Sequence, residues 1–257
     1  MRRDVDPCTD LTGHSMRNIS RKIGRLIGGG QPKFARQDYK QTWNSISGTE
    51  DAAKMAVGGH TDETLYKDTG LATKRMLEET VGVRPDDVIL EIGAGVGRVG
   101  AVLAPVCRKW IGADVSAGMV RHMRHRLAAF PNAEPVEISG FDLAPVPDAS
   151  VDMVYCTIVF MHLEEWDRYN YVREAYRVLK PGGRLYVDNV NQLTDAGWEV
   201  FEAHRAIPPQ KRPPYISKTS TPQELINYLT RAGFDGIRNF DRERYVVVYG
   251  TKPQRHS

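Results

Sequence analysis

A short apolar run followed by a glycine-rich turn constrains the fold of this chain more than any other stretch. Residues 88–98 read VILEIGAGVGR, so an apolar run containing one acid leads into glycines at every second position. A run of this kind is typical of a buried strand in a parallel sheet, and a helical pattern follows from Gly97. Because glycine leaves the backbone bare, we expect a ligand to lie against this turn, close to the positive end of the helix dipole.

Two kinds of ligand compete for this turn. Residues 95–100 match the G-x-G-x-x-G fingerprint of dinucleotide binding, with Asp114 downstream to hold a ribose. Glu91, however, stands at the end of the strand, where a carboxylate would repel an anionic pyrophosphate and attract a cationic ligand. The pattern favours a cationic ligand, and it leaves open both the dinucleotide and a turn that binds nothing.

The rest of the chain continues as alternating strands and helices. Such alternation, closed by a strand pair, predicts an α/β protein with a doubly wound sheet. Ser116 and Thr221 are expected N-caps, since each is a hydroxyl residue at the start of a helical pattern. The expected strands are 88–93, 110–115, 134–139, 152–159, 184–190, 236–240 and 245–251, and the helices that follow the first strand are 97–104, 116–127, 164–179 and 221–233.

The chain divides into a basic arm, a helical segment and a sheet-forming domain. The arm, residues 1–35, is expected to be partly disordered or amphipathic, since eight Lys or Arg and only three Asp occur through Arg36. Residues 36–80 are expected to form a helical lid, with separate helices at 61–71 and 71–81. Residues 81–257 then form the ligand-binding domain, in which 191–220 are a long connection without clear structure that covers the substrate.

Composition and charge narrow the class of protein. The 257 residues, 41% hydrophobic and 26% charged, are typical of a soluble globular domain. No apolar run approaches the roughly 20 residues that span a bilayer, and no secretory signal is evident, so we expect a cytoplasmic protein. A near-neutral body argues against a nucleic-acid partner. The basic arm suits peripheral contact with an anionic membrane, while a capping helix or a disordered arm stay as alternatives, and the oligomeric state is undetermined.

Five segments agree in order and spacing with one known family. They are E-x-G-x-G-x-G at 91–97, Asp114 after the second strand, FDL at 141–143, DMVY at 152–155 and LKPGGRL at 179–185. Together they resemble class I S-adenosylmethionine (SAM)-dependent methyltransferases, in particular the small-molecule branch that includes ubiquinone-biosynthesis-type enzymes. Over residues 70–250 the resemblance implies a Rossmann-like seven-stranded sheet, order 3-2-1-4-5-7-6, with strand 7 antiparallel and an N-terminal helical extension.

The resemblance also implies how SAM is bound. Glu91 would accept from its ammonium group, Asp114 from both ribose hydroxyls, and Asp142 from the adenine amino group. The remaining expected contacts are Gly93, Ala94 and Gly95 through their backbone, Val115 and Met119 against the adenine, Leu143 through its backbone N–H, and Thr157 and Ile158 at the methyl end.

The acceptor side is less defined. Methylation of a hydroxyl or an ammonium group requires removal of a proton, and His162, after the fourth strand, is the candidate base. Catechol-type methyltransferases hold magnesium with an Asp-Asn pair and an acid after the fourth strand, but residues 156–159 read CTIV, so no metal is expected. The candidate substrate residues are Trp43, Asp188, Asn189, Asn191 and Trp198.

We therefore expect a SAM-dependent methyltransferase (EC 2.1.1.-) that acts on a small molecule, with O-methylation favoured over N- or C-methylation. Two alternatives remain. One is an NAD-linked oxidoreductase built on residues 95–100, and the other is a SAM-binding or membrane-surface interaction protein without catalysis.

Overall fold

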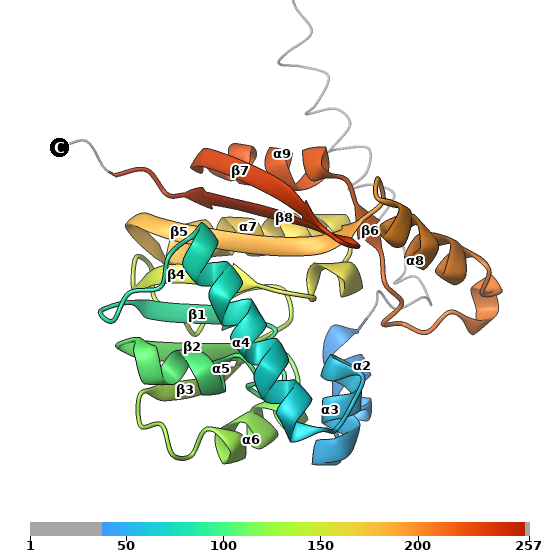
Figure 1. Ribbon diagram of the computed structural model, residues 1–257, viewed down its shortest axis with the longest axis horizontal. Helices are drawn as coiled ribbons and strands as arrows, with labels where there is room; N and C mark the ends of the chain where they lie inside the picture. The colour runs from blue at the N-terminus through green and yellow to red at the C-terminus, as the bar shows by residue number, and fades with distance from the viewer. Residues whose placement is uncertain (1–37, 255–257) are drawn as a thin grey trace, which may run out of the picture. The chain divides into compact units, whose positions relative to one another are not determined.

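The computed structural model describes residues 38–254, and the expectations for the basic arm lie outside these residues. Helices α2 (Tyr39–Ser45), α3 (Glu50–Gly58) and α4 (Glu63–Thr80) precede the sheet (Figure 1). The strands are β1 (Val88–Ile92), β2 (Lys109–Asp114), β3 (Ala133–Glu137), β4 (Val151–Cys156), β5 (Leu179–Asn191), β6 (Thr219–Ser220), β7 (Asp235–Arg242) and β8 (Tyr245–Thr251). The other helices are α5 (Gly100–Leu103), α6 (Ala117–Arg126), α7 (Glu165–Val178), α8 (Asp195–Arg205) and α9 (Pro222–Ala232), with 3-10 turns η1 (Ala104–Val106), η2 (Phe160–His162) and η3 (Pro209–Lys211).

Within residues 38–254, eight strands form one sheet. Seven of them lie in the order β3-β2-β1-β4-β5-β8-β7, which confirms the predicted topology once β6 is allowed for in the numbering. Strands β1 to β5 pair in parallel, and β8 runs antiparallel to both β5 and β7. The predicted count of seven strands is one short, because β6 pairs with the end of β5 through two residues only and leaves no hydrophobic pattern in the sequence.

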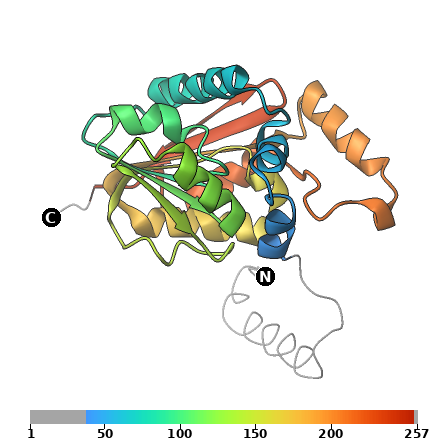
Figure 2. The same ribbon diagram turned by 90° about the horizontal axis from the view of Figure 1, so that it is seen from below.

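Helices cover both faces of the sheet (Figure 2). On one face, α4, α5 and α6 pack on a cluster that includes Trp110, Tyr155 and Tyr186. On the other face, α7 and α9 pack on a second cluster that includes Leu90 and Val154. Both faces of the central strands are therefore buried, which explains why β1 and β4 read as continuous apolar runs rather than as alternating patterns.

Local signals begin and end several helices as predicted. Ser116 Oγ accepts the N–H of Met119 at 3.2 Å, and Thr221 Oγ1 accepts the N–H of Glu224 at 3.3 Å. Gly233 ends α9 in the left-handed conformation with φ 97°, which glycine adopts without steric cost. The two caps place the ends of β2 and β6 next to helix starts.

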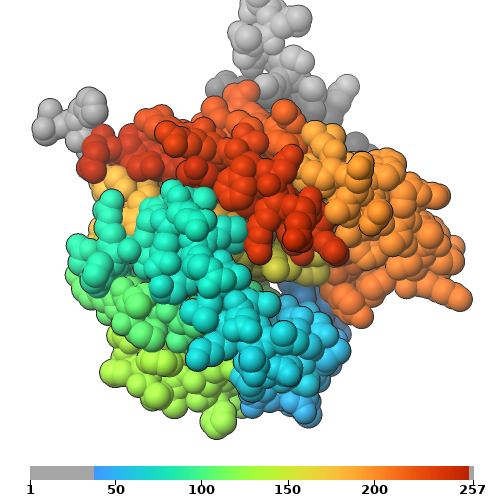
Figure 3. Space-filling model, viewed as in Figure 1, coloured from blue at the N-terminus to red at the C-terminus, as the bar shows by residue number. Residues whose placement is uncertain are grey.

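Three stretches differ from the sequence prediction. Residues 63–80 form one helix rather than two: Asp62 caps α4, and the helix continues through Gly70, whose lack of a side chain lets it pack closely on the Arg98 carbonyl group. Residues 191–220 contain α8, which begins at the N-cap Thr194 and which the proline-rich segment after it concealed in the sequence. These residues lie at one side of the molecule, in orange (Figure 3). Residues 179–183, expected to end α7 as a turn, already belong to β5.

Candidate active site

A cavity of about 270 Å³ lies at the carboxyl ends of β1, β2 and β4. This edge of a parallel sheet is where open α/β proteins bind ligands. Its polar lining comes from Glu91, Arg98, Asp114, Thr157 and His162, and its wall is otherwise mostly apolar. The apolar and glycine lining residues are Tyr39, Trp43, Ala56, Val57, Ile92, Gly93, Ala94, Gly95, Val96, Val115, Met119, Ile138, Gly140, Ile158, Val159, Met161, Leu163 and Tyr171.

The glycine turn after β1 forms one side of this cavity. Gly93 and Gly95 have φ angles of 72° and 54°, a conformation that a side chain would strain. A Cβ on Gly93 would also lie 2.3 Å from Val159 Cγ2. The N–H groups of Gly93 and Ala94 both donate to the Ala113 carbonyl, at 2.8 and 3.1 Å. The turn is therefore held against the end of β2.

Asp114 ties the same turn to the start of α6. Its Oδ2 accepts the Gly95 N–H at 2.8 Å, and its Oδ1 accepts the Ser116 N–H at 2.9 Å. Burial raises the pKa of Asp114 to about 6, although the backbone N–H groups act in the opposite direction. Because each oxygen can accept more than one hydrogen bond, the carboxylate can still receive donors from the cavity.

Glu91 is the second carboxyl group of the cavity and is 4% exposed. Tyr155 donates its hydroxyl hydrogen to Glu91 Oε2 at 2.5 Å. Burial raises the pKa of Glu91 to about 8, which outweighs the lowering by Tyr155 and by Arg98. Glu91 is therefore mostly protonated at neutral pH when the cavity holds no cation.

Glu91→Gln is expected to make the protein more stable at alkaline pH. A pKa raised in the folded state contributes stability that is complete below pH 4.5 and is lost as the pH rises through about 8. The glutamine variant carries no charge and avoids this loss, so at pH 9 its free energy of unfolding should exceed that of the wild type by up to about 5 kcal/mol. Urea unfolding at pH 4 and pH 9 checks this, and an equal difference at both pH values would contradict it.

His162 lies in η2 on another side of the cavity. Its Nδ1 is 2.8 Å from the carbonyl oxygen of Tyr215, and its ring meets the Trp43 ring edge-on with centroids 5.0 Å apart. A carbonyl oxygen only accepts, so Nδ1 carries the hydrogen and Nε2 keeps its lone pair. Burial lowers the pKa of His162 to about 4 despite the opposing effect of the Tyr215 carbonyl, so the ring is neutral near pH 7.

The turn between β4 and η2 carries a backbone conformation rarely seen outside glycine. Ile158 has φ 60°, and its N–H donates to Asp188 Oδ1 at 2.7 Å. Such a conformation persists only where neighbouring contacts hold it. Asp188 thus supports the wall formed by Thr157 and Ile158, both of which line the cavity.

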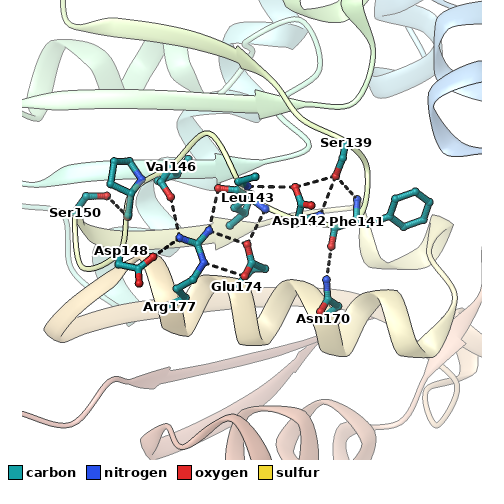
Figure 4. Close-up of polar contacts among 12 residues, drawn as sticks. Ser139, Phe141, Asp142, Leu143, Val146, Asp148, Ser150, Asn170, Glu174 and Arg177 are labelled. Carbon is teal, nitrogen blue, oxygen red and sulfur yellow. Dashed lines mark hydrogen bonds and ion pairs between the residues drawn. The ribbon is translucent and has the colours of Figure 1, made fainter.

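Two residues expected beside the adenine do not line the cavity, and Figure 4 shows their hydrogen bonds to other residues of the chain. Asp142 Oδ1 accepts from Ser139 Oγ and from the Ala144 N–H, so the carboxylate closes its own loop. The Leu143 N–H, expected to face the cofactor, donates instead to Glu174 Oε2 at 2.9 Å. The local motif occurs where it was expected, but the Asp142 carboxylate bonds within its own loop and the Leu143 N–H is directed towards α7.

The substrate residues predicted at the end of β5 are also outside the cavity lining. Asn189 donates to Ser220 Oγ on β6 and Asn191 to Asp241 Oδ1 on β7, so both amides bond to other strands of the sheet. Trp198 stacks on Phe201 within α8 and is 46% exposed. Of the five candidate substrate residues, only Trp43 lines the cavity, because the others face sheet neighbours or solvent.

Some lining residues belong to no motif. Tyr39 and Val57 come from the helical segment before the sheet, where the aromatic side chain of Tyr39 suggested substrate contact or core packing and Val57 gave no signal. Tyr39 is held by Asp167, to which its hydroxyl donates at 2.9 Å, and by the Glu164 N–H. Arg98 was the one detectable omission, since a cation directly after a glycine turn is a signal for anion binding.

Among residues 38–254 no group of His, Cys, Asp or Glu could hold a metal ion, and no helix is both long and apolar enough to cross a membrane.

Comparison with known proteins places the chain beside methyltransferases. A family model described as a methyltransferase domain matches residues 90–187. A demethylmenaquinone methyltransferase from Clavibacter sepedonicus is 37% identical over 208 residues, which cover 73% of this chain and 81% of that protein. A probable S-adenosylmethionine-dependent methyltransferase from Mycolicibacterium smegmatis is 36% identical over 149 residues, or 57% of this chain. The chain spans only 51% of that protein's length.

A solved structure has the same fold. Magnesium protoporphyrin IX methyltransferase from Synechocystis PCC 6803, determined with bound SAH, matches with a TM-score of 0.56 at 15% identity. The match covers 91% of this chain and 94% of that one. At this identity the likeness extends to the fold alone.

Proposed function

The chain belongs to the class I SAM-dependent methyltransferases, and on this premise we propose that it transfers a methyl group from SAM to a hydroxyl group of a small, apolar, ring-bearing acceptor. SAM supplies the reactive methyl group on its sulfonium sulfur. The observation that carries the proposal is the pair of buried carboxyl groups, Glu91 and Asp114, which face one cavity on either side of the glycine turn. Glu91 suits the ammonium group of SAM, and Asp114 suits its ribose hydroxyls.

The glycine pattern that also fits a dinucleotide has a packing explanation. A Cβ on Gly100 would lie 2.6 Å from the Trp110 ring, so this glycine allows α5 to approach β2. With the family established, a pyrophosphate is not needed to explain residues 95–100. The NAD-linked alternative is therefore set aside.

The nature of the acceptor is proposed from the apolar wall of the cavity. Trp43, Val57 and Met161 line the same cavity as His162, and the Trp43 ring contacts the His162 ring. Aromatic and aliphatic walls with few polar groups suit a flat, apolar molecule. Thr157 offers one hydroxyl for orientation.

The state of His162 supports oxygen as the methylated atom. A base whose pKa is about 4 is too weak to remove the proton of an ammonium group before the reaction. It can, however, take the proton of a hydroxyl oxygen, which becomes strongly acidic as that oxygen gains the methyl group. His162 Nε2, left free by the bond at Nδ1, would receive this proton.

His162→Gln is expected to lower the methyl-transfer rate by about 100-fold, because positioned acid–base groups contribute at least that much. SAM affinity should stay unchanged, since His162 acts on the acceptor. Initial rates at saturating SAM, with calorimetry for affinity, check this. His122→Gln is the matched control, because His122 also bonds a backbone carbonyl, that of Ser47, and lies outside the cavity lining. Full activity of the His162 variant would rule out its role as base.

The proposed function is tested by binding and then by turnover. Calorimetry with SAM and with NAD identifies the cofactor. Methyl-labelled SAM is then incubated with the protein and a panel of phenols, amines and carbon acids, and labelled products are identified by mass. Labelling confined to amines would contradict the proposal of O-methylation, and SAM binding without any transfer would favour a non-catalytic protein.

A further inference from the structure

Two buried hydrogen bonds in series end on the Glu91 carboxyl group. Trp110 Nε1 donates to the Tyr155 hydroxyl oxygen at 3.1 Å, and this hydroxyl donates to Glu91 Oε2 at 2.5 Å. The three residues lie on the adjacent strands β2, β4 and β1, with β1 in the middle. Trp110 and Tyr155 are both 0% exposed. Trp110 and Tyr155 thus form a fully buried hydrogen-bonded pair behind Glu91, which lines the cavity.

Only one arrangement of hydrogens satisfies this series. An indole N–H donates and never accepts, so the Tyr155 oxygen is the acceptor for Trp110. The single hydroxyl hydrogen of Tyr155 is then directed to Glu91 Oε2. A proton carried by Glu91 itself is therefore on Oε1, the oxygen that Tyr155 does not contact.

The titratable groups around Glu91 come from every neighbouring element. Burial is the main reason why its pKa is high, the Tyr155 hydroxyl and the Arg98 guanidinium lower it, and Asp114 raises it. The Cys156 thiol, next to Tyr155 on β4, has a pKa raised well above its usual value by burial and stays uncharged. At neutral pH Glu91 is therefore poised to lose its proton when a further positive charge arrives.

We propose that Glu91 releases one proton to solvent when the ammonium group of SAM binds beside it, and that Tyr155 is the positioning residue that stabilises the resulting carboxylate. The inference rests on the proposed function, because it assigns the ammonium group to Glu91. Loss of the Tyr155 hydroxyl removes a hydrogen bond that is stronger to a carboxylate than to a carboxylic acid. Tyr155→Phe should therefore weaken SAM binding by about tenfold at pH 7.

Infrared difference spectroscopy of SAM binding is the decisive measurement, combined with calorimetry. In the wild type, the C=O stretching band of a carboxylic acid should disappear when SAM is added. In Glu91→Gln this band should be absent. In Tyr155→Phe it should persist at a higher frequency before SAM is added, because the hydrogen bond to the carbonyl oxygen is lost.

Tyr186→Phe is the matched control. Tyr186 is the register partner of Tyr155 on β5, is equally buried, and its hydroxyl contacts Met76 Sδ instead of a carboxyl group. This variant should keep the wild-type band and affinity. Thermal unfolding of all variants shows whether each has folded.

The outcomes separate the inference from the proposed function. If the wild type does not bind SAM, the proposed function fails and the inference fails with it. If SAM binds but no carboxylic acid band is lost, Glu91 does not release a proton and the inference alone is overturned. If the Tyr155 and Tyr186 variants change the band and the affinity alike, Tyr155 has no positioning role.

Discussion

Asp114→Asn is expected to weaken SAM binding by about 1–3 kcal/mol, which corresponds to roughly 5- to 150-fold in affinity. Both carboxylate oxygens already accept backbone N–H groups, from Gly95 and from Ser116. An amide would turn a hydrogen-bond donor towards one of these N–H groups, so the glycine turn or the start of α6 must shift. The variant also loses the negative charge that strengthens hydrogen bonds from ribose hydroxyls. Calorimetric titration with SAM measures the change.

Asp142→Asn is the comparison for this prediction. Its carboxylate accepts from Ser139 and Ala144 within its own loop and does not line the cavity. We therefore expect its effect on SAM affinity to be much smaller than that of Asp114→Asn. Unchanged affinity in the Asp114 variant would refute its assignment to the ribose, and a larger effect at Asp142 would restore the adenine contact that the family resemblance implies.

Arg168→Met is expected to lower the free energy of unfolding by about 3 kcal/mol or more. Arg168 is 3% exposed. Its Nε donates to the carbonyl oxygens of Phe160 and Leu163, and its Nη1 contacts Ser220 Oγ and Glu224 Oε1 at 2.8 and 3.0 Å. Methionine fills the space but leaves these acceptors without a donor, which costs more than the loss of a surface ion pair.

The same variant should also lower the methyl-transfer rate, because the two carbonyl groups belong to the turn that carries His162. Urea unfolding and initial rates are the measurements. Arg177→Met is the matched control: Arg177 also holds carbonyl groups and carboxylates, but its side chain is 29% exposed. Its replacement should cost about 1 kcal/mol. Equal losses for both arginines would show that burial does not govern the difference.

Short patterns predicted the part of the site that lies within one strand and its turn. The acid, the glycines and the next strand's aspartate are close in sequence, and the parallel pairing of β1 with β2 brings Glu91 and Asp114 to one edge. The Ser116 cap adds a helix start at the same edge. These contacts follow from local conformation and strand order, so the sequence is sufficient for them.

Three polar groups at predicted site positions have hydrogen-bond partners within the chain. Asp142, Asn189 and Asn191 occupy the positions that family resemblance or strand ends suggested. In the structure their side chains bond to Ser139, Ser220 and Asp241. A buried polar group needs a hydrogen-bond partner, and the sequence does not show whether that partner is a ligand or another residue of the chain.

The sequence by itself determined the alternation of strands and helices, the glycine turn and the two acids beside it, because each depends on residues close together in the chain, whereas the strand order was implied by the family resemblance. Only the tertiary structure decided what closes the cavity and what supports it. Trp43 meets His162, and Tyr155 meets Glu91, through packing between segments far apart in the chain. Such contacts arise from the shape and burial of whole elements, for which a single sequence carries no local signal.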